Sequence, residues 1–348
     1  MKADALKLCV YFGDSVTAGP ALSSDALMDC FADHGLASAT LLRGIEGFGI
    51  NRRINAERFP DASTDLPLLA VAVDTRERIR SVLDDVDLAV PRGLVTLEQA
   101  RLATGKDVRD AELPPGSGGA AKLTIYCTAG ERVRRRPSYR EAVALLRRRG
   151  AAGATVLTGA DGIAGGRRRR VQVLSAGASA PMIVVSVGRA DALRRSLPGL
   201  AEIFESPVVT LEPIAQLKHD GEALEPPPTA ASAGVDERAV WQAIHLYTRR
   251  SAQVDGRALH SELVRRLREA GAAGATTILG DWGFSGDERP YGDRLGRVTS
   301  HRPTYTVYVD SPAKVAETWP LIDELTAEHG IVTSRFVPGY RERPARSL

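Results

Sequence analysis

The string GLASAT at residues 35–40 returns as GAAGAT at residues 150–155 and again at residues 271–276. In each copy a glycine follows the threonine after four residues, and a second glycine follows after three more. These glycines are Gly44, Gly159 and Gly280, and then Gly47, Gly162 and Gly283. Self-similarity at fixed offsets is the mark of a tandem repeat. The chain is therefore expected to contain three copies of one unit.

Landmarks on both sides of this string extend the repeat. A tyrosine precedes each string, a proline opens an alternating apolar run after it, and a Val-Thr pair closes the unit. They are Tyr11, Tyr126 and Tyr247, then Pro67, Pro181 and Pro303, then the pairs at 95–96, 209–210 and 332–333. The predicted domains are residues 5–100, 120–214 and 239–341, named here copy one, copy two and copy three.

Each copy has the same expected order of elements. In copy one, residues 8–12 form a β-prone run, and Leu27, Met28 and Phe31 make one apolar stripe of a helix that ends near Gly35. Strand two, a long loop, strand three, a second helix and strand four follow. The order βαββαβ is the split-βαβ, ferredoxin-like plan of an α+β protein.

A sheet with both helices on one face leaves its other face bare, and an apolar bare face needs a cover. Three copies in one chain can cover one another. We therefore expect an intramolecular pseudo-trimer that is a monomer in solution. The Pro- and Gly-rich segments 100–121 and 213–239 are interpreted as flexible or semi-extended linkers.

Composition narrows the class of protein. The chain has 348 residues, with 46 Lys and Arg against 43 Asp and Glu, so its net charge of +3 does not by itself indicate a polyanion partner. Its three cysteines show no metal-ligand or disulfide spacing, which indicates a reducing compartment. We see no signal peptide and no long apolar span. These features predict a cytoplasmic protein.

The repeat resembles a bacterial family of PII-like proteins of unknown function. The resemblance rests on GLASATLLRGIEGFG at residues 35–49 and DLPL at residues 65–68, and it spans nearly all of copy one. Copies two and three match its framework more loosely. The Gly-Phe-Gly at residues 47–49 also resembles the start of the long T-loop of classical PII signalling proteins.

This resemblance implies a trimeric arrangement with small effectors in the clefts between units. Adenine nucleotides are one such effector, and the long loop then contacts a membrane transporter or an enzyme. We therefore predict a regulatory protein that binds a small ligand, such as a nucleotide or an anion. The candidate ligand-binding residues are Arg43, Gly44, Gly47, Phe48, Gly49, Arg52 and Arg53 in copy one, and Gly283, Phe284 and Gly286 in copy three.

The loops of the three copies differ, so fewer than three equivalent sites are expected. Copy one keeps the glycines and adjacent arginines. Copy three adds Asp287 and Glu288, which would repel an anion, and copy two inserts four arginines at 167–170. The strongest site is expected at the loop of copy one.

Two other classes of function are less well supported. Twelve arginines between Arg132 and Arg170 suggest a nucleic-acid-binding surface on copy two as the alternative function. However, strand three lacks the aromatic pair on which RNA-binding modules of this topology stack bases. Walker, zinc-protease and nucleophile-elbow motifs are missing, so we expect no enzyme activity. His245 and His260 are interpreted as structural residues, and no metal site is predicted.

Overall fold

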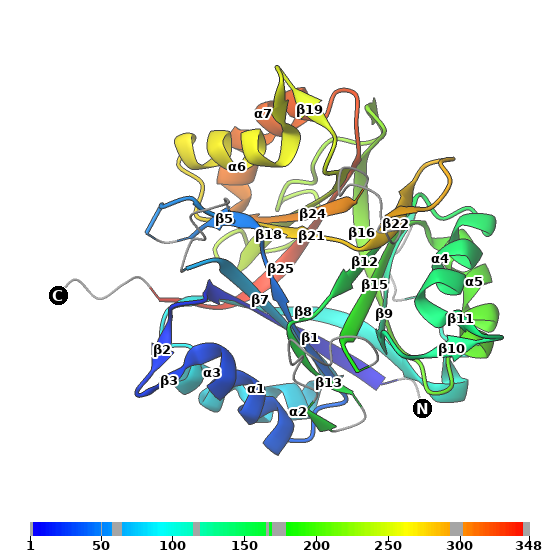
Figure 1. The fold of residues 1–348 in the computed structure, drawn as a ribbon. Coiled ribbons are helices and arrows are strands. Elements are labelled where there is room, and N and C mark those ends of the chain that lie inside the picture. Colours follow the sequence, from blue (N-terminus) through cyan, green and yellow to red (C-terminus); the bar gives the residue numbers. More distant parts are fainter. Residues whose placement is uncertain are drawn as a thin grey trace.

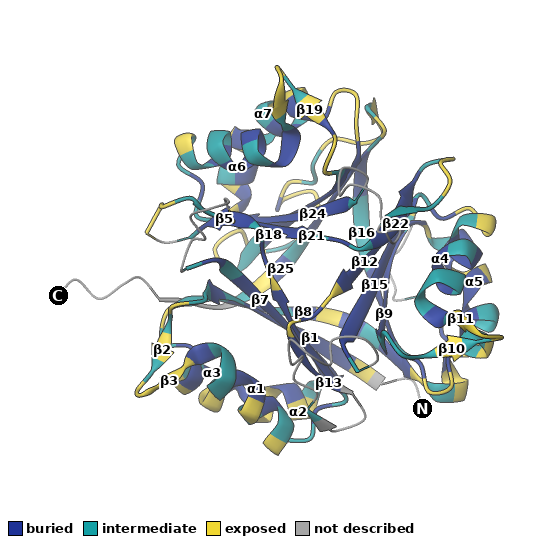
Figure 2. Ribbon diagram, in the orientation of Figure 1, coloured by how far each residue is buried: buried dark blue, intermediate teal, exposed yellow. Residues whose placement is uncertain are grey.

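The computed structural model describes residues 3–49, 51–57, 65–113, 119–164, 167–168, 179–292 and 302–343. Figure 1 shows three lobes around a common centre, each with its helices outside and its sheet inside. The sheets are buried and the outward helix faces are exposed (Figure 2). The protein is a mixed α/β molecule with three repeated units, rich in strands.

Copy one contains four main strands, several short strands, three α-helices and one 3₁₀ helix. Its elements are β1 (Ala3–Gly13), β2 (Thr17–Ala18), β3 (Ala21–Leu22), α1 (Ser23–Asp33), β4 (Ser38–Arg43), β5 (Glu46–Phe48), β6 (Asn55–Ala56), β7 (Pro67–Thr75), α2 (Arg76–Ser81), α3 (Leu83–Ala89), β8 (Gly93–Thr104) and the 3₁₀ helix η1 (Gly105–Asp110).

Copies two and three repeat this order with one continuous second helix each. Copy two has β9 (Ala120–Thr128), β10 (Arg132–Val133), β11 (Arg136–Pro137), α4 (Ser138–Arg148), β12 (Gly153–Thr158), β13 (Asp161–Ala164), β14 (Arg167–Arg168), β15 (Pro181–Arg189), α5 (Ala190–Ile203), β16 (Val208–His219) and β17 (Glu222–Ala223). Copy three has β18 (Val240–Arg249), β19 (Gln253–Val254), β20 (Arg257–Ala258), α6 (Leu259–Glu269), β21 (Ala275–Leu279), β22 (Trp282–Ser285), β23 (Tyr291–Gly292), β24 (Pro303–Asp310), α7 (Pro312–Leu325) and β25 (Ile331–Arg343).

The four main strands of each copy pair in one antiparallel order. In copy one the order is β8–β1–β7–β4, and in copy two it is β16–β9–β15–β12. Copy three has the order β25–β18–β24–β21. The first strand of each copy therefore lies between the fourth and the third, as the βαββαβ order requires for a single sheet.

The residues that predicted helix ends in the sequence lie at helix ends in the structure. Gly35, Gly150 and Gly271 follow the first helix of each copy with φ of +57°, +83° and +82°, a region that favours glycine. At α7, the Ser311 hydroxyl accepts a hydrogen bond from the Lys314 amide, and Pro312 opens the helix. The apolar stripe of α1 (Leu27, Met28 and Phe31) is buried in the core of copy one.

A fourth core lies between the three sheets. Its members come from the inner faces of all three copies, including Val73 and Val71 of copy one, Val185 and Val187 of copy two, and Val307 and Val309 of copy three. These residues are at most 8% exposed. The bare sheet faces expected from the sequence therefore cover one another.

The last strands of the copies also join the sheets in a closed ring. The end of β8 pairs with the start of β16 (Thr104↔Val208), and the end of β16 pairs with the start of β25 (His219↔Ile331). The end of β25 returns to the start of β8 (Arg343↔Gly93). Each fourth strand thus serves two sheets.

This ring corrects the linker prediction. Residues 100–104 belong to β8, residues 105–110 form η1, and β16 continues through residue 219. The strand residues pair with a neighbouring copy, and Val108 of η1 is buried in the core of copy two, which explains the regular structure of these parts of the predicted linkers. The Pro-Gly run at residues 114–118 lies outside the described residues. In the described part of the chain, no helix is long and apolar enough to cross a membrane.

Candidate functional site

The repeated glycines and threonines meet at three junctions between copies. A short strand after the second strand of one copy pairs with the second strand of another: β5 with β21, β13 with β4, and β22 with β12. We name them the one–three, two–one and three–two junctions. Gly47 lies opposite Thr276, Gly162 opposite Thr40, and Gly283 opposite Thr155. The sequence landmarks therefore mark the contacts that hold the copies together.

The first landmark glycine of each copy is confined by its neighbours. The Gly44 amide donates to the Pro67 carbonyl oxygen at 2.8 Å, and the same bond recurs from Gly159 to Pro181 and from Gly280 to Pro303. A Cβ on Gly44 would lie 2.7 Å from Pro67 Cγ and 3.1 Å from the Thr276 methyl. Only glycine fits there without a shift of the proline or of the neighbouring copy.

The second landmark glycine lets two backbones approach. A Cβ on Gly47 would lie 2.4 Å from the Ala275 carbonyl oxygen, and one on Gly283 would lie 2.3 Å from that of Ala154. The next residue then enters a neighbouring core: Phe48 packs in the core of copy three, and Phe284 in that of copy two. The predicted site residues Gly283 and Phe284 are thus built into a junction.

The loop arginines of copy one have partners within the protein. Arg43 forms an ion pair with Asp14 at 2.6 Å. Arg52 adopts φ +53° and donates to the Gly271 carbonyl oxygen at 2.9 Å, which ties the loop to copy three. Arg53 is exposed. The Gly286 amide, in copy three, donates to the Ala152 carbonyl oxygen at 2.8 Å.

A cavity of about 240 Å³ opens at the one–three junction. Gly47, Phe48 and Gly49 line it, together with residues of β1, β8 and copy three. The volume is just below the ~300–1,000 Å³ of typical small-molecule sites. Three of the ten predicted site residues thus lie at one concave surface, whereas Arg43, Arg52 and Arg53 do not line it.

The wall of this cavity is largely apolar. Phe12, Leu94 and Val307 contribute to it, and Trp241 supplies an indole ring from copy three. Trp241 lies six residues before the repeated Tyr247, where copies one and two carry alanines (Ala5 and Ala120). Sequence reasoning missed Trp241, although its departure from the repeat was a readable signal.

Polar groups gather at one side of the cavity. The Asp65 carboxylate accepts hydrogen bonds from the Ser15 amide at 3.0 Å and from the Ser15 hydroxyl at 2.7 Å. Gly13 permits this, since a Cβ there would lie 2.3 Å from the Asp65 carboxylate. Asn55 lines the same side, and Arg92 lies exposed at the lining. Arg92 makes no hydrogen bond or ion pair with the described residues, so its guanidinium is available to a ligand.

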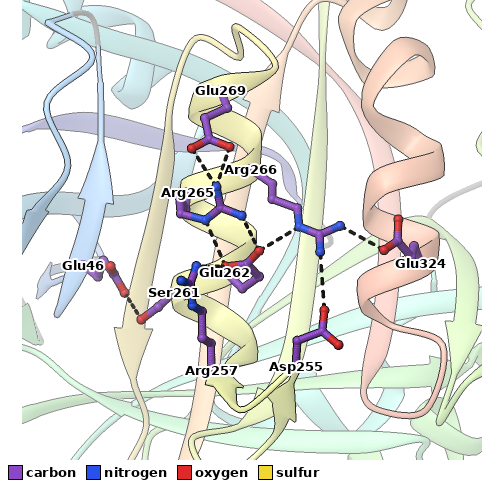
Figure 3. A network of polar contacts seen from close by, with 9 residues as sticks. All are labelled: Glu46, Asp255, Arg257, Ser261, Glu262, Arg265, Arg266, Glu269 and Glu324. Carbon is purple, nitrogen blue, oxygen red and sulfur yellow. Dashed lines mark hydrogen bonds and ion pairs between the residues drawn. The ribbon is translucent and has the colours of Figure 1, made fainter.

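One hydrogen bond joins β5 of copy one to α6 of copy three, beside a group of ion pairs within copy three (Figure 3). The Ser261 hydroxyl donates to the Glu46 carboxylate at 2.5 Å. Farther along α6, the Glu262 carboxylate accepts hydrogen bonds from Arg265 and Arg266, which keep its pKa at about 2. Arg266 also reaches Glu324 of α7 at 2.9 Å. The Ser261–Glu46 bond thus ties β5, whose Gly47 and Phe48 line the cavity, to copy three.

Several arginines of copy two are engaged in internal contacts. Arg168 pairs with Asp161 at 2.6 Å and with Asp25 and Asp29 of α1 in copy one. Arg147 donates to backbone carbonyl oxygens of copy three, and Arg140 lies 4.5 Å over the Trp282 ring. Arg169 and Arg170 lie outside the described residues. Arg168 therefore contacts copy one, whereas Arg140 and Arg147 contact copy three.

A group of metal-ligand type that the sequence did not suggest lies on the surface of copy one. Ligand atoms of Cys30 on α1, of His34 just after its end and of Asp85 on α3 lie within 4.8 Å of one another. His34 Nδ1 is 2.9 Å from the Cys30 carbonyl oxygen, and Nε2 is 3.4 Å from Asp85. These contacts already occupy both ring nitrogens, so we assign no metal to this group.

Comparison with known proteins places these features in a family. A curated relative, the UPF0166 protein of Aquifex aeolicus (strain VF5), is 28% identical over 76 residues, which cover 22% of this chain and 71% of the relative. A solved structure titled "Crystal structure study of anthrone oxidase-like protein" covers 60% of this chain and 91% of its own, with 13% identity and a TM-score of 0.19. A likeness that low carries no argument.

The family model of DUF190, described as "Uncharacterized ACR", matches the chain three times, at residues 5–102, 120–216 and 241–338. The three matches confirm the prediction of three tandem copies of an uncharacterised family. Because they cover most of the sequence, the chain belongs to the DUF190 family.

Proposed function

We propose that the chain is a closed pseudo-trimer of ferredoxin-like units and a monomer in solution. The cyclic pairing of β8, β16 and β25 supports this, since it leaves no copy without two neighbours. Light scattering should give the mass of one chain, 37.2 kDa. An obligate assembly of three whole chains would contradict the proposal.

We further propose that the protein binds one small ligand at the one–three junction and acts as a PII-like regulator. The observation that carries this is the cavity of about 240 Å³ where the Gly-Phe-Gly loop of copy one meets Trp241 of copy three. Largely apolar pockets with a few convergent polar groups are the usual sites for small molecules. The family resemblance supports a ligand-dependent contact with a transporter or enzyme.

The lining favours a ligand with a flat, weakly polar ring. Trp241 contributes an aromatic side chain to the lining, and Asp65 and Asn55 contribute hydrogen-bonding groups. Arg92 gives one cation for an acidic group of the ligand. A nucleoside or nucleoside monophosphate fits this pattern better than a triphosphate, because the other loop arginines of copy one do not line the cavity.

The test uses the position of Trp241 as a reporter. Adenosine, AMP and ATP, with the corresponding guanine compounds, are titrated against the whole chain while tryptophan fluorescence is followed. Calorimetry gives the stoichiometry. We expect one ligand per chain, a change of fluorescence that is lost in Trp241→Phe, and tighter binding of the compounds with zero or one phosphate.

Trp319→Phe serves as the matched control, because Trp319 lies on α7, packs against the core of copy three and does not line the cavity. This variant should keep the full response. Three equal sites per chain, or an unchanged fluorescence response in Trp241→Phe, would contradict binding at the one–three junction.

A further inference from the structure

A second cavity, of about 30 Å³, lies between the three sheets. We name it the central chamber. Lys7, Glu98, Lys122 and His245 line it, with residues from all three copies, and every lining residue except Tyr11 is buried. One water needs about 10–15 Å³ measured in this way, so the chamber holds two waters or one ion of similar size.

Three of the residues that line the chamber, Lys7, Glu98 and Lys122, belong to a buried cluster of five charges. Lys7 Nζ lies 2.7 Å from both Glu98 and Glu212, and Lys122 Nζ lies 3.0 Å from Glu212. Arg335 completes the cluster, 3.1 Å from Glu98 and also paired with Glu212. Three cations therefore share two carboxylates, and the cluster carries one uncompensated positive charge.

A comparison of the three copies explains the origin of this excess positive charge. Lys7 and Lys122 lie four residues before their repeated tyrosines, but copy three has Ala243 at that position. Glu98 and Glu212 lie two residues after their repeated threonines, but copy three has Arg335 there. Three identical copies would give three Lys–Glu pairs and no net charge. The substitutions of copy three turn a balanced cluster into a cationic one.

Two groups that line the chamber have unused capacity to donate hydrogen bonds to described residues, His245 through Nε2 in the tautomer in which Nδ1 accepts from Tyr305, and Lys122 through its ammonium. His245 is 2% exposed, and its Nδ1 is 2.8 Å from the Tyr305 hydroxyl, while Nε2 has no partner among the described residues. The Lys122 ammonium has three N–H donors, and its ion pairs reach only Glu212 at 3.0 Å and Glu98 at 3.9 Å. Buried donors of this kind are normally satisfied by a bound species.

We propose that the central chamber binds one small monovalent anion of the halide class, with chloride as the ion of ordinary solutions. The anion neutralises the excess charge of Lys7, Lys122 and Arg335 and accepts a hydrogen bond from the spare donors. The volume excludes phosphate esters and carboxylate metabolites. Burial lowers the pKa of Lys122 to about 8; Glu212 and Glu98 oppose this lowering, and Lys7 and Arg335 add to it.

The first test compares melting temperatures of the whole chain in chloride and in gluconate at equal ionic strength. A saturable rise of roughly 2–4 °C with chloride is expected, since an ion that binds only the folded state stabilises it. Lys122→Met leaves two cations against two carboxylates and should remove the chloride response. Arg53→Met, which removes an exposed cation outside the chamber, should keep it.

The second test does not depend on a folded variant. Crystals of the wild-type protein grown in bromide should show one anomalous peak in the chamber, between Lys122 and His245. A chamber that contains only water in such crystals, or a chloride response that persists unchanged in Lys122→Met, would overturn the proposal.

Discussion

The one–three and three–two junctions have the same backbone pairing but different interiors. Gly47 of β5 faces Thr276, and Gly283 of β22 faces Thr155. At the three–two junction, the Ile331 side chain lies against Gly153, where a Cβ would be 2.6 Å from Ile331 Cδ1. At the one–three junction, a Cβ on the equivalent Gly274 would meet only backbone atoms of β5 and its end. There Leu94, the counterpart of Ile331, lines the open cavity.

The polar contacts of the two junctions differ in the same way. Glu46 of β5 is held by the hydroxyl of Ser261, whereas the counterpart pair at the three–two junction is Trp282 beneath the guanidinium of Arg140. The backbone contacts are therefore a shared framework, while the side chains make the interiors of the two junctions differ. The predictions below test this division, from the largest expected effect to the smallest.

Valine in place of the second landmark glycine should damage both junctions equally. In Gly47→Val and Gly283→Val the new Cβ meets a carbonyl oxygen of the facing strand. We expect each variant to lower the free energy of unfolding by about 3 kcal/mol, as for overpacked buried sites. Urea denaturation measures this. A stable Gly283→Val protein beside an unfolded Gly47→Val protein would show that the frameworks are not equivalent.

Acid should weaken the one–three junction through His260. Burial, followed by the charge of Arg250, lowers the pKa of this imidazole to about 4, whereas an unfolded histidine titrates near 6.5. The contribution of neutral His260 to the free energy of unfolding is thus complete above about pH 6.5 and is lost as the pH falls from there towards 4. Between about pH 7.5 and pH 5, wild type should lose about 2 kcal/mol more stability than His260→Gln.

The control for this titration is Tyr139→Phe, at the equivalent position of α4, which should keep the acid sensitivity of wild type. Unfolding curves in denaturant at a series of pH values give the comparison. If wild type and His260→Gln lose stability in parallel, His260 is not the acid-sensitive group.

Truncation of tryptophan should separate binding from stability. Trp241→Ala removes the aromatic wall of the cavity and should weaken the best ligand at least tenfold, about 1.4 kcal/mol. Trp282→Ala removes a ring of the same kind from the three–two junction. It should lower stability and leave the ligand affinity within about twofold, by calorimetry under folded conditions. Equal loss of affinity in both variants would mean that the ligand does not bind at the one–three cavity.

The arginines of copy one should have the smallest effects on binding. Arg43→Ala and Arg53→Ala should change the affinity for a monophosphate less than twofold, about 0.4 kcal/mol, because neither residue lines the cavity. Arg92→Ala should weaken the monophosphate more than the nucleoside. A strong loss in Arg53→Ala would instead support the loop arginines as the phosphate site that the sequence suggested.

The sequence determined the plan of the molecule because its landmarks recur at constant offsets. Three copies, the βαββαβ order and the glycines that end the first helices follow from local rules of periodicity and backbone conformation. The Gly-Phe-Gly string was also recognisable as a special segment. Its position beside a cavity agrees with the prediction that the copy-one loop borders the strongest site, a prediction that binding measurements still have to test.

Only the tertiary structure decided what those landmarks do. Gly47 and Thr276 are 229 positions apart in the numbering, and no local pattern indicates that they face each other. The same holds for Phe48, which packs in the core of copy three. It also holds for the ion pair of Arg43 with Asp14 and for the hydrogen bond from Arg52 to the Gly271 carbonyl oxygen. Trp241 and the five buried charges became neighbours only when the three sheets closed around one centre. Long-range pairing sets such contacts, so both proposed sites lie between copies whose individual folds could be read from sequence alone.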